Sequence, residues 1–286
     1  MNPLVSVLMT AYNREKYIAE AIESVLASTY NNFELIIVDD GSADNTVAIA
    51  RSFKEKDKRI KLFVNEKNLG QFSNRNKAAG YATGEFLMNA DSDDTLYADG
   101  IENCVNAMLS FPQSSFGMFY AAKGQAPFVI DSKDAIWQHF FKQPFLTIGP
   151  GGTIIHRRFF NEINKYPVIY GVPGDMYFNL KATCFTPIVM LPFEFMYYRR
   201  HEGQEINNAY SYLIYNYNYL KDALAELPLQ LSKKEVEWLG KKNKRRFFFN
   251  VVKYFFKTYN LSVVREAVKK AGFGYKDALT GIFHIG

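Results

Sequence analysis

Short apolar segments alternate with segments of helical periodicity through the first hundred residues, and this alternation restricts the chain to a few folds. The apolar segments, typical of buried strands, are 5–9, 33–38, 60–64 and 85–88. The segments of helical periodicity between them are 17–26, 44–53 and 72–82. Strands that alternate with helices along a chain pair mainly in parallel, with the helices covering both faces of the sheet. We therefore predict an α/β fold with a mostly parallel sheet flanked by helices.

Residues that could contact a ligand, most of them polar or aromatic, follow three of these strands at the point where each strand ends. They are Thr10, Ala11 and Tyr12 after the first strand, Asp39 and Asp40 after the second, and Asp91, Ser92, Asp93 and Asp94 after the fourth. Ligands of open α/β sheets bind beyond the carboxyl ends of the strands. We therefore expect these residues to converge on one ligand.

The run Asp91-Ser92-Asp93-Asp94 places three carboxylates within four residues. Crowded carboxylates repel one another, so the run needs a cation or another positive partner. A hard divalent ion such as Mg²⁺ or Mn²⁺, shared with a phosphate-bearing ligand, fits oxygen donors of this kind. A calcium loop of the EF-hand type is excluded, because the sixth position is Leu96 where that loop needs glycine. A solvated acidic turn is the alternative.

From about residue 209 the pattern is helical, and it includes a basic aromatic stretch at 241–260. On a helix its aromatic and apolar side chains Phe248, Val252, Phe255 and Tyr259 share one face, and lysines and arginines share another. Such a helix suits peripheral contact with a membrane surface. The alternative is that this aromatic face packs on the preceding domain. No recognition motif for nucleic acid accompanies the basic residues, so we expect no nucleic-acid partner.

Composition agrees with a folded protein outside the membrane core. The chain has 286 residues, 48% of them hydrophobic, a net charge of +5 and two cysteines. It shows no basic, apolar leader at its start and no window of about 20 apolar residues. We expect a cytoplasmic protein, or one held peripherally on the cytoplasmic face of a membrane.

Taken in order, these motifs resemble those of a family 2 glycosyltransferase of the GT-A (Rossmann-like) type. The matching segments are 5–13, 33–42, Asn68-Leu69-Gly70 with Arg75-Asn76, Asp91-Ser92-Asp93-Asp94, Gly174-Asp175 and Tyr198-Arg199-Arg200-His201. Each segment alone is weak, whereas the ordered set over about 3–205 is specific. The resemblance implies a catalytic domain at 1–208 and a helical extension at 209–286.

The resemblance also implies how a nucleotide donor is held. Thr10, Ala11 and Tyr12 would contact uracil, and Asp40 would accept its N3–H, while Asp39 would support the turn. The alternative is a polar turn that only caps the next helix. Arg75 and Asn76 would reach the base or a phosphate, unless Arg75 is a surface residue.

For the acidic run the resemblance implies a DxD element that contacts ribose and a Mn²⁺ or Mg²⁺ ion. Asp93 and Asp94 are both candidate metal ligands, Asp91 and Ser92 are donor-binding candidates, and His201 could complete the metal shell. A structural role for this histidine is the alternative.

Asp175 corresponds to the family's general base, although an ordinary helix cap would use the same residue. The implied reaction is inverting transfer from a UDP-sugar to a hydroxyl of a glycan or lipid-linked acceptor, in bacterial surface polysaccharide synthesis. A non-catalytic nucleotide-sugar or glycan-binding module is the alternative. A dinucleotide oxidoreductase is disfavoured, because no G-x-G-x-x-G follows the first strand.

Overall fold

The computed structural model describes residues 2–122, 124–202, 204 and 209–283. Among these residues, eight strands form one sheet in the order β3-β2-β1-β4-β8-β6-β9-β7. Their bounds are Val5–Ala11 (β1), Phe33–Asp39 (β2), Ile60–Val64 (β3), Phe86–Asn89 (β4), Phe116–Phe119 (β6), Phe128–Ile130 (β7), Thr153–His156 (β8) and Ile188–Leu191 (β9). A small antiparallel pair joins Thr95–Leu96 (β5) to Met196–Tyr197 (β10).

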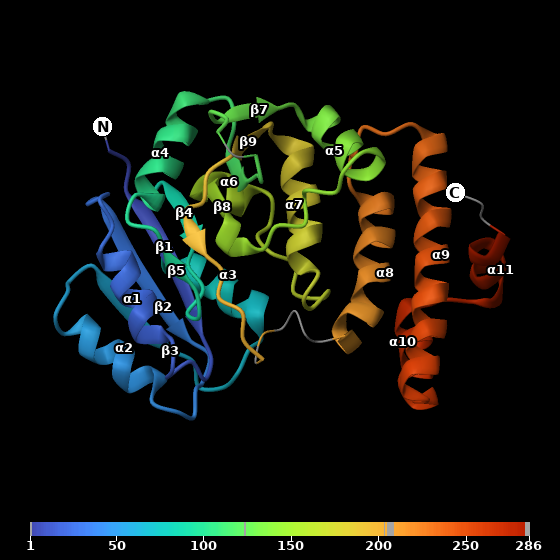
Figure 1. Cartoon of the computed structure of the whole chain (residues 1–286), viewed down its shortest axis with the longest axis horizontal. Helices are drawn as coiled ribbons and strands as arrows, with labels where there is room; N and C mark the ends of the chain where they lie inside the picture. Colours follow the sequence, from blue (N-terminus) through green and yellow to red (C-terminus); the bar gives the residue numbers. More distant parts are fainter. Residues whose placement is uncertain (1, 123, 203, 205–208, 284–286) are drawn as a thin grey trace.

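Helices cover both faces of the sheet and extend beyond it at the C-terminal side (Figure 1). Within the sheet domain they are Ile18–Leu26 (α1), Thr46–Lys54 (α2), Gln71–Tyr81 (α3), Gly100–Ser110 (α4), Ser132–Phe141 (α5), Arg157–Glu162 (α6) and Gly174–Phe185 (α7). The C-terminal helices are Ala209–Glu226 (α8), Lys233–Thr258 (α9), Leu261–Ala271 (α10) and Tyr275–Phe283 (α11). The predicted α/β fold with C-terminal helices is confirmed.

The two faces of β1 show why the first strands form a sheet buried on both sides. Val5, Val7 and Met9 belong to the hydrophobic cluster shared with α1 and α4, whereas Leu8 belongs to the cluster shared with α3 and α7. Successive strand residues point to opposite faces, so a strand covered by helices on both sides needs a continuous apolar run. The segment Val5-Ser6-Val7-Leu8-Met9 is apolar except for Ser6, whose buried hydroxyl donates a hydrogen bond to Glu34 (2.6 Å).

The second half of the sheet departs from a simple parallel order. β4 pairs antiparallel with β8, and β8 pairs antiparallel with β6. The chain therefore reverses direction next to β4, and its later loops return to the edge where β1 and β4 end. This reversal brings residues of the region 145–176 opposite the acidic run.

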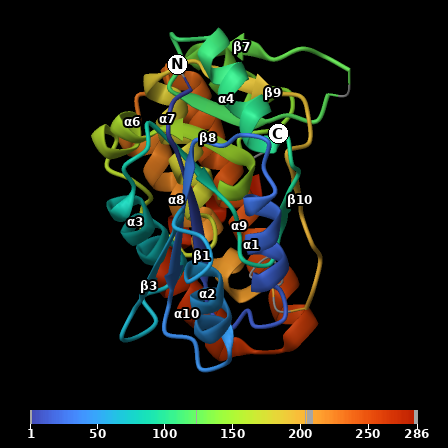
Figure 2. The ribbon, with the colours of Figure 1, turned by 90° about the vertical axis from the view of Figure 1, so that its left-hand side faces the viewer.

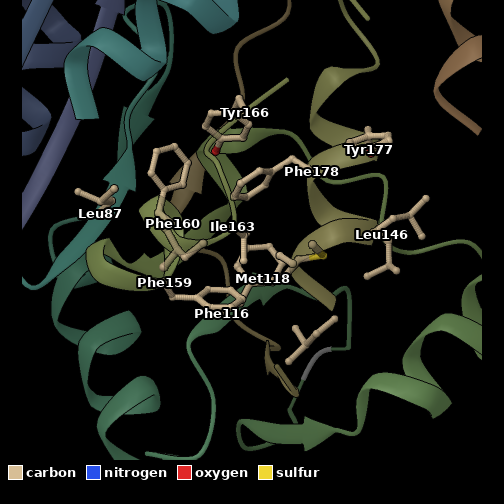
Figure 3. Close-up of a cluster of buried hydrophobic side chains, with 14 of the residues drawn as sticks. Leu87, Phe116, Met118, Leu146, Phe159, Phe160, Ile163, Tyr166, Tyr177 and Phe178 are labelled. Atoms are coloured by element: carbon tan, nitrogen blue, oxygen red, sulfur yellow. The ribbon is translucent and has the colours of Figure 1, made fainter. Parts of the chain in front are cut away.

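A hydrophobic cluster beneath this returning region contains three aromatic rings in mutual contact (Figure 3). The ring centroids of Tyr166 and Phe178 are 4.3 Å apart, and Phe160 lies within 5.4 Å of both. Tyr219, Leu220 and Ala223 of α8 belong to the same buried cluster. The predicted boundary at residue 208 lies outside the described residues, but α8 packs into the core of the sheet domain.

Across the described part of the chain, no helix is both long enough and apolar enough to cross a bilayer.

Candidate active site

An open pocket of about 530 Å³ lies where β1 and β4 end and α3 and α7 begin. Its walls come from segments far apart in sequence. The lining residues are Thr10, Ala11, Tyr12, Arg14, Asp40, Asn68, Gly70, Gln71, Asn74, Arg75, Asp91, Ser92, Asp93, Asp94, Thr147, Ile148, Gly149, Pro150, Val172, Asp175, Met176, Tyr198 and Gln204. Most of the residues expected to converge on a ligand therefore do lie around one cavity.

The end of β1 is fixed on both sides, so its polar residues face the pocket in a defined way. β1 pairs with β2 over its whole length and with β4 over residues 5–8. The hydroxyl of Ser92 donates a hydrogen bond to the carbonyl of Thr10 (2.8 Å), which ties the acidic run to this strand. Tyr12 is 44% exposed at the pocket wall, so its ring is available for stacking.

The two aspartates after β2 have different surroundings. Asp39 is fully buried and does not line the pocket; its carboxylate accepts hydrogen bonds from the backbone N–H groups of Gly41 (3.0 Å) and Ser42 (2.8 Å). Asp40 does line the pocket, and it accepts from the backbone N–H groups of Leu69 (2.9 Å) and Gly70 (3.0 Å). Through these contacts Asp39 closes the turn that follows β2.

The residues Arg75 and Asn76, adjacent on α3, point in different directions. Arg75 is buried and its guanidinium pairs with Asp91 and donates to Asn89 (3.1 Å), so the alternative of a surface arginine is excluded. Asn76 does not line the pocket. Its amide instead exchanges two hydrogen bonds with the backbone of Tyr166 (2.8 and 3.1 Å).

Each carboxylate of the acidic run has a positive or N–H partner supplied by the protein. Besides the Arg75–Asp91 pair, Arg14 Nε donates to Asp93 Oδ2 at 3.0 Å, and His201 Nε2 lies 2.9 Å from the same oxygen. Asp94 accepts from the backbone N–H of Arg199 at 2.9 Å. We expected a cation or another positive partner beside these carboxylates, and Arg14 and Arg75 supply positive partners for Asp93 and Asp91.

The proposed metal ligands do not form a closed cage. Among the described residues no group of three histidine, cysteine, aspartate or glutamate side chains is placed to hold an ion. Asp94 faces the Arg199 backbone, and burial, together with the charge of Asp91, raises its pKa to about 7. Asp93 and His201 remain an adjacent oxygen and nitrogen donor. That pair fits Mn²⁺ or Mg²⁺, which commonly take one or two protein ligands and complete their shell with phosphate and water.

Asp175 lies in the first turn of α7, on the opposite wall of the pocket. Gly174 before it is required by packing, because a Cβ at that position would lie 2.6 Å from the Phe72 ring. The half-buried carboxylate has a pKa raised to about 7 mainly by burial, although the Met176 N–H and the charge of Arg75 oppose the shift. A carboxylate with this pKa is suited to proton transfer near neutral pH.

The loop 145–150, which forms the wall near Asp175, was not anticipated from the sequence. The side-chain amide of Asn179 donates to the carbonyls of Leu146 (3.2 Å) and Ile148 (2.8 Å). His139 Nδ1 accepts from the N–H groups of Phe145 (3.2 Å) and Leu146 (3.1 Å), and burial lowers the pKa of this imidazole to about 4, so it stays neutral. The loop is therefore rigidly placed, yet its residues carry no charged motif.

Arg14 is a second pocket residue that was not predicted from the sequence. It follows Tyr12 by two residues at the end of β1 and lines the pocket beside Asp93. A basic residue directly after a ligand-facing strand end could have been singled out from the sequence.

The fold is of the GT-A class, and across its pocket the residues at the strand ends face a wall that carries Asp175. The sequence model described as Glycosyl transferase family 2 matches residues 6–168, which is more than half of the chain. The chain belongs to this family.

Two curated relatives match part of the chain. WfgD of Escherichia coli, a UDP-Glc:alpha-D-GlcNAc-diphosphoundecaprenol beta-1,3-glucosyltransferase, is 44% identical over 106 residues, covering 37% of this chain and 41% of that protein. An uncharacterized glycosyltransferase of Haemophilus influenzae is 41% identical over 107 residues, covering 37% of this chain and 43% of that protein. The aligned segments thus span about two fifths of these relatives.

Solved structures match almost the whole chain in fold. Staphylococcus aureus TarS, crystallised as residues 1–349 with UDP-GlcNAc, superposes with a TM-score of 0.71 at 18% identity, covering 93% of this chain and 79% of that one. The mannosyltransferase PcManGT from Pyrobaculum calidifontis, in complex with GDP-Man and Mn²⁺, gives a TM-score of 0.66 at 15% identity, covering 98% and 78%. At these identities the likeness establishes the fold alone.

Proposed function

We propose that the protein transfers a sugar from a nucleotide-diphosphate donor, most simply a UDP-sugar, to a hydroxyl group of a glycan or lipid-linked acceptor. The observation that carries this proposal is the pairing of two unlike groups across one pocket. Asp175, with a pKa near 7, faces the carboxylates and arginines at the ends of β1 and β4. A nucleotide diphosphate suits the charged side, and a neutral hydroxyl suits the carboxylate.

Family membership supports the reaction class, and two named proteins support the donor and the acceptor. TarS was crystallised with UDP-GlcNAc, and WfgD by its name acts on a diphosphoundecaprenol-linked sugar. We extend both features to this chain: a UDP-linked donor and an acceptor of glycan or lipid-linked type, in the synthesis of a bacterial surface polysaccharide. Peripheral contact with a membrane through 241–260 belongs to the same proposal.

In the proposed mechanism Asp175 accepts the proton of the acceptor hydroxyl while that oxygen attacks the anomeric carbon. The attack inverts the anomeric centre in one displacement, and no covalent intermediate forms. Asp175 must be ionised to act, and its pKa of about 7 leaves a large fraction ionised at neutral pH. Tyr12 would stack on the base, and Asp40 would accept its N3–H.

The departing diphosphate would lie beside Asp93 and Arg14. The Arg14 guanidinium lines the pocket there and would stabilise phosphate charge. When bound, a Mn²⁺ or Mg²⁺ ion held by Asp93 and His201 would add Lewis-acid stabilisation of the leaving group.

The first test is calorimetric titration of the protein with UDP, GDP and a small panel of their sugars, in Mn²⁺ and then in EDTA. We expect UDP to bind in Mn²⁺ and to bind less tightly in EDTA and in the variant Asp93→Asn. The matched control is Asp99→Asn, an exposed aspartate outside the pocket lining, which should bind like the wild type. Failure of every nucleotide to bind would refute the donor assignment.

A second measurement separates the enzyme from a non-catalytic nucleotide-sugar or glycan-binding module. Donors that bind are incubated with the protein and extracted glycolipid acceptors, and release of free UDP is followed. Release that depends on the acceptor and is lost in Asp175→Asn supports transfer. Tight donor binding with no release against any acceptor would favour the binding module instead.

A further inference from the structure

The segment 240–265, which forms most of α9 and the start of α10, carries a concentrated positive charge. It contains eight lysine and arginine residues and no aspartate or glutamate. The whole chain has a net charge of +5, so the rest of the molecule is net acidic. The excess of positive charge is therefore concentrated in one segment that lies outside the matched family domain.

Folding divides the aromatic residues of α9 differently from the expected pattern. The face that packs against α8 and α10 contains Phe247, Val251 and Tyr254, and Phe247 is only 3% exposed. Of the predicted face, Phe248, Val252 and Phe255 are half-buried, whereas Tyr259 is 75% exposed. Aromatic side chains outside the packed face are left in solvent toward the end of the helix.

The exposed residues at the junction of α9 and α10 form what we call the basic–aromatic tip. Its members are Phe249, Lys253, Phe256, Lys257, Tyr259 and Leu261. Phe256 is 64% exposed and Tyr259 is 75% exposed. Phe249, Lys253, Phe256 and Lys257 follow the spacing of one helix face, so the tip presents aromatic and cationic groups together. Tyr259 ends α9 in a left-handed conformation, and α10 begins at Leu261.

Among the described residues, no acidic side chain forms an ion pair with the lysines of the tip. Elsewhere on α9, Lys241 pairs with Glu237 (2.7 Å) and Lys244 pairs with Asp277 (2.8 Å). Within the part of the chain that the structure describes, neither Lys253 nor Lys257 forms such a pair. Exposed apolar side chains interleaved with unneutralised lysines suit a surface that is both apolar and negatively charged.

The position of the tip relative to the pocket adds an independent argument. In Figure 1 β1 and β2 run from the edge near the N-terminus toward the lower edge, where the pocket lies at their carboxyl ends. The junction of α9 and α10 also lies at this lower edge, and Figure 2, turned about the same vertical axis, agrees. A flat surface that met the tip would therefore face the edge that carries the pocket.

We propose that the basic–aromatic tip docks on an anionic lipid bilayer and holds the pocket edge toward it. Lysines near such a surface gain electrostatic energy, and Phe256 and Tyr259 enter the interfacial layer. The purpose of the docking rests on the proposed function, because a lipid-linked acceptor would be presented at that surface. The docking itself needs neither donor nor acceptor.

The test is co-sedimentation of the full chain with vesicles of phosphatidylcholine alone and of phosphatidylcholine mixed with phosphatidylglycerol. We expect binding only to the mixed vesicles, with weakening as salt rises. The double variant Lys253→Glu, Lys257→Glu should lower the vesicle affinity by about tenfold or more. Phe256→Ser should lower it without changing its dependence on salt.

Two matched variants serve as controls. Lys233→Glu with Lys234→Glu makes the same charge change at the opposite end of α9, and Phe185→Ser removes another exposed phenylalanine, 58% exposed, at the end of α7. Both should bind vesicles like the wild type. Equal loss in the two charge variants, or equal binding to neutral vesicles, would overturn the proposal. So would failure to bind vesicles together with tight, Lys253-dependent binding of an oligonucleotide. Because no nucleotide sugar is present, these results do not depend on the donor titrations.

Discussion

The two walls of the pocket differ in chemistry and in how the chain builds them. One, the charged wall, contains Arg14, Arg75, Asp91 and Asp93 and stands at the ends of parallel strands. The other, the apolar wall, contains Ile148, Pro150, Val172 and Met176 in loops and a helix start, with Asp175 as its acidic group.

This difference separates two tasks. In the charged wall Arg75 pairs with Asp91 and Arg14 pairs with Asp93, so the wall holds charged groups of both signs in fixed positions beside the pocket. In the apolar wall burial is the largest influence on Asp175 and raises its pKa to about 7. One wall is thus built for binding charge, and the other for moving a proton.

The largest expected effect comes from removing the charge of the apolar wall. Asp175→Asn should lower kcat by about 10²- to 10⁴-fold, because a general base contributes that much, while the donor Kd stays within about twofold. Steady-state kinetics and calorimetry measure the two quantities. Asp134→Asn, an exposed aspartate in the first turn of α5, is the control. An equal loss of donor affinity would mean that Asp175 contributes to donor binding, as the charged wall does, and would contradict its role as the base.

Asp175→Asn should also change how the thermal stability of the protein depends on pH. The pKa of Asp175 in the folded protein, about 7, exceeds its ordinary value of 3.8, so this group favours the folded state at low pH and loses that contribution as pH rises through 7. Asp175→Asn removes this dependence. The variant should therefore gain thermal stability relative to the wild type at pH 8 compared with pH 5.

The second effect concerns the ion pair that organises the charged wall. Arg75→Met should lower the free energy of unfolding by about 3 kcal/mol, because it leaves Asp91 without its buried partner. Urea denaturation measures the change. Arg158→Met is the control, because Arg158 is 91% exposed and its pair with Glu162 contributes little. Equal stability of the two variants would mean that the charged wall is not held together by this pair.

The charged wall was largely predictable from the sequence, and the apolar wall was not. Residues 10–12, Asp40 and the acidic run follow apolar strands directly, so local pattern and the rule for strand ends suffice to place them. The side chains that pair with these residues could not be predicted in the same way. Arg14 is 79 residues from Asp93 and His201 is 108 residues away, and only the folded chain brings them together.

The loop 145–150 has no local signal, because its position depends on buried contacts with His139 and Asn179 on two helices. The antiparallel β8 that returns this region to the pocket is likewise a tertiary feature. Asn76 shows that a local pattern can also misplace a residue. Helical periodicity placed it near Arg75, but a one-residue step turns its side chain toward the backbone of Tyr166.

A smaller effect is expected at the rim of the charged wall. Tyr12→Ala should weaken UDP binding by about tenfold, because a stacked aromatic contributes on the order of 1–3 kcal/mol per base, whereas Tyr12→Phe should bind normally. Tyr197→Ala is the control, since this tyrosine is 53% exposed and does not line the pocket. If Tyr12→Phe lost as much affinity as Tyr12→Ala, the hydroxyl and not the ring would be the contact.

The smallest effect tests whether burial in the apolar wall sets the pKa of the base. Because Asp175 acts as the ionised form, kcat should rise with pH and level off above about 7. Val172→Thr keeps the side-chain volume but adds a hydroxyl to the wall, which eases solvation of the carboxylate. The midpoint of the rise should then move down by roughly half a unit or less. Val168→Thr, at an exposed position in the same loop outside the pocket lining, should leave the midpoint unchanged. An equal shift of the midpoint in both variants would mean that the loop backbone, and not burial of the carboxylate, sets the pKa of Asp175. The electrostatic difference between the two walls would then be wrong.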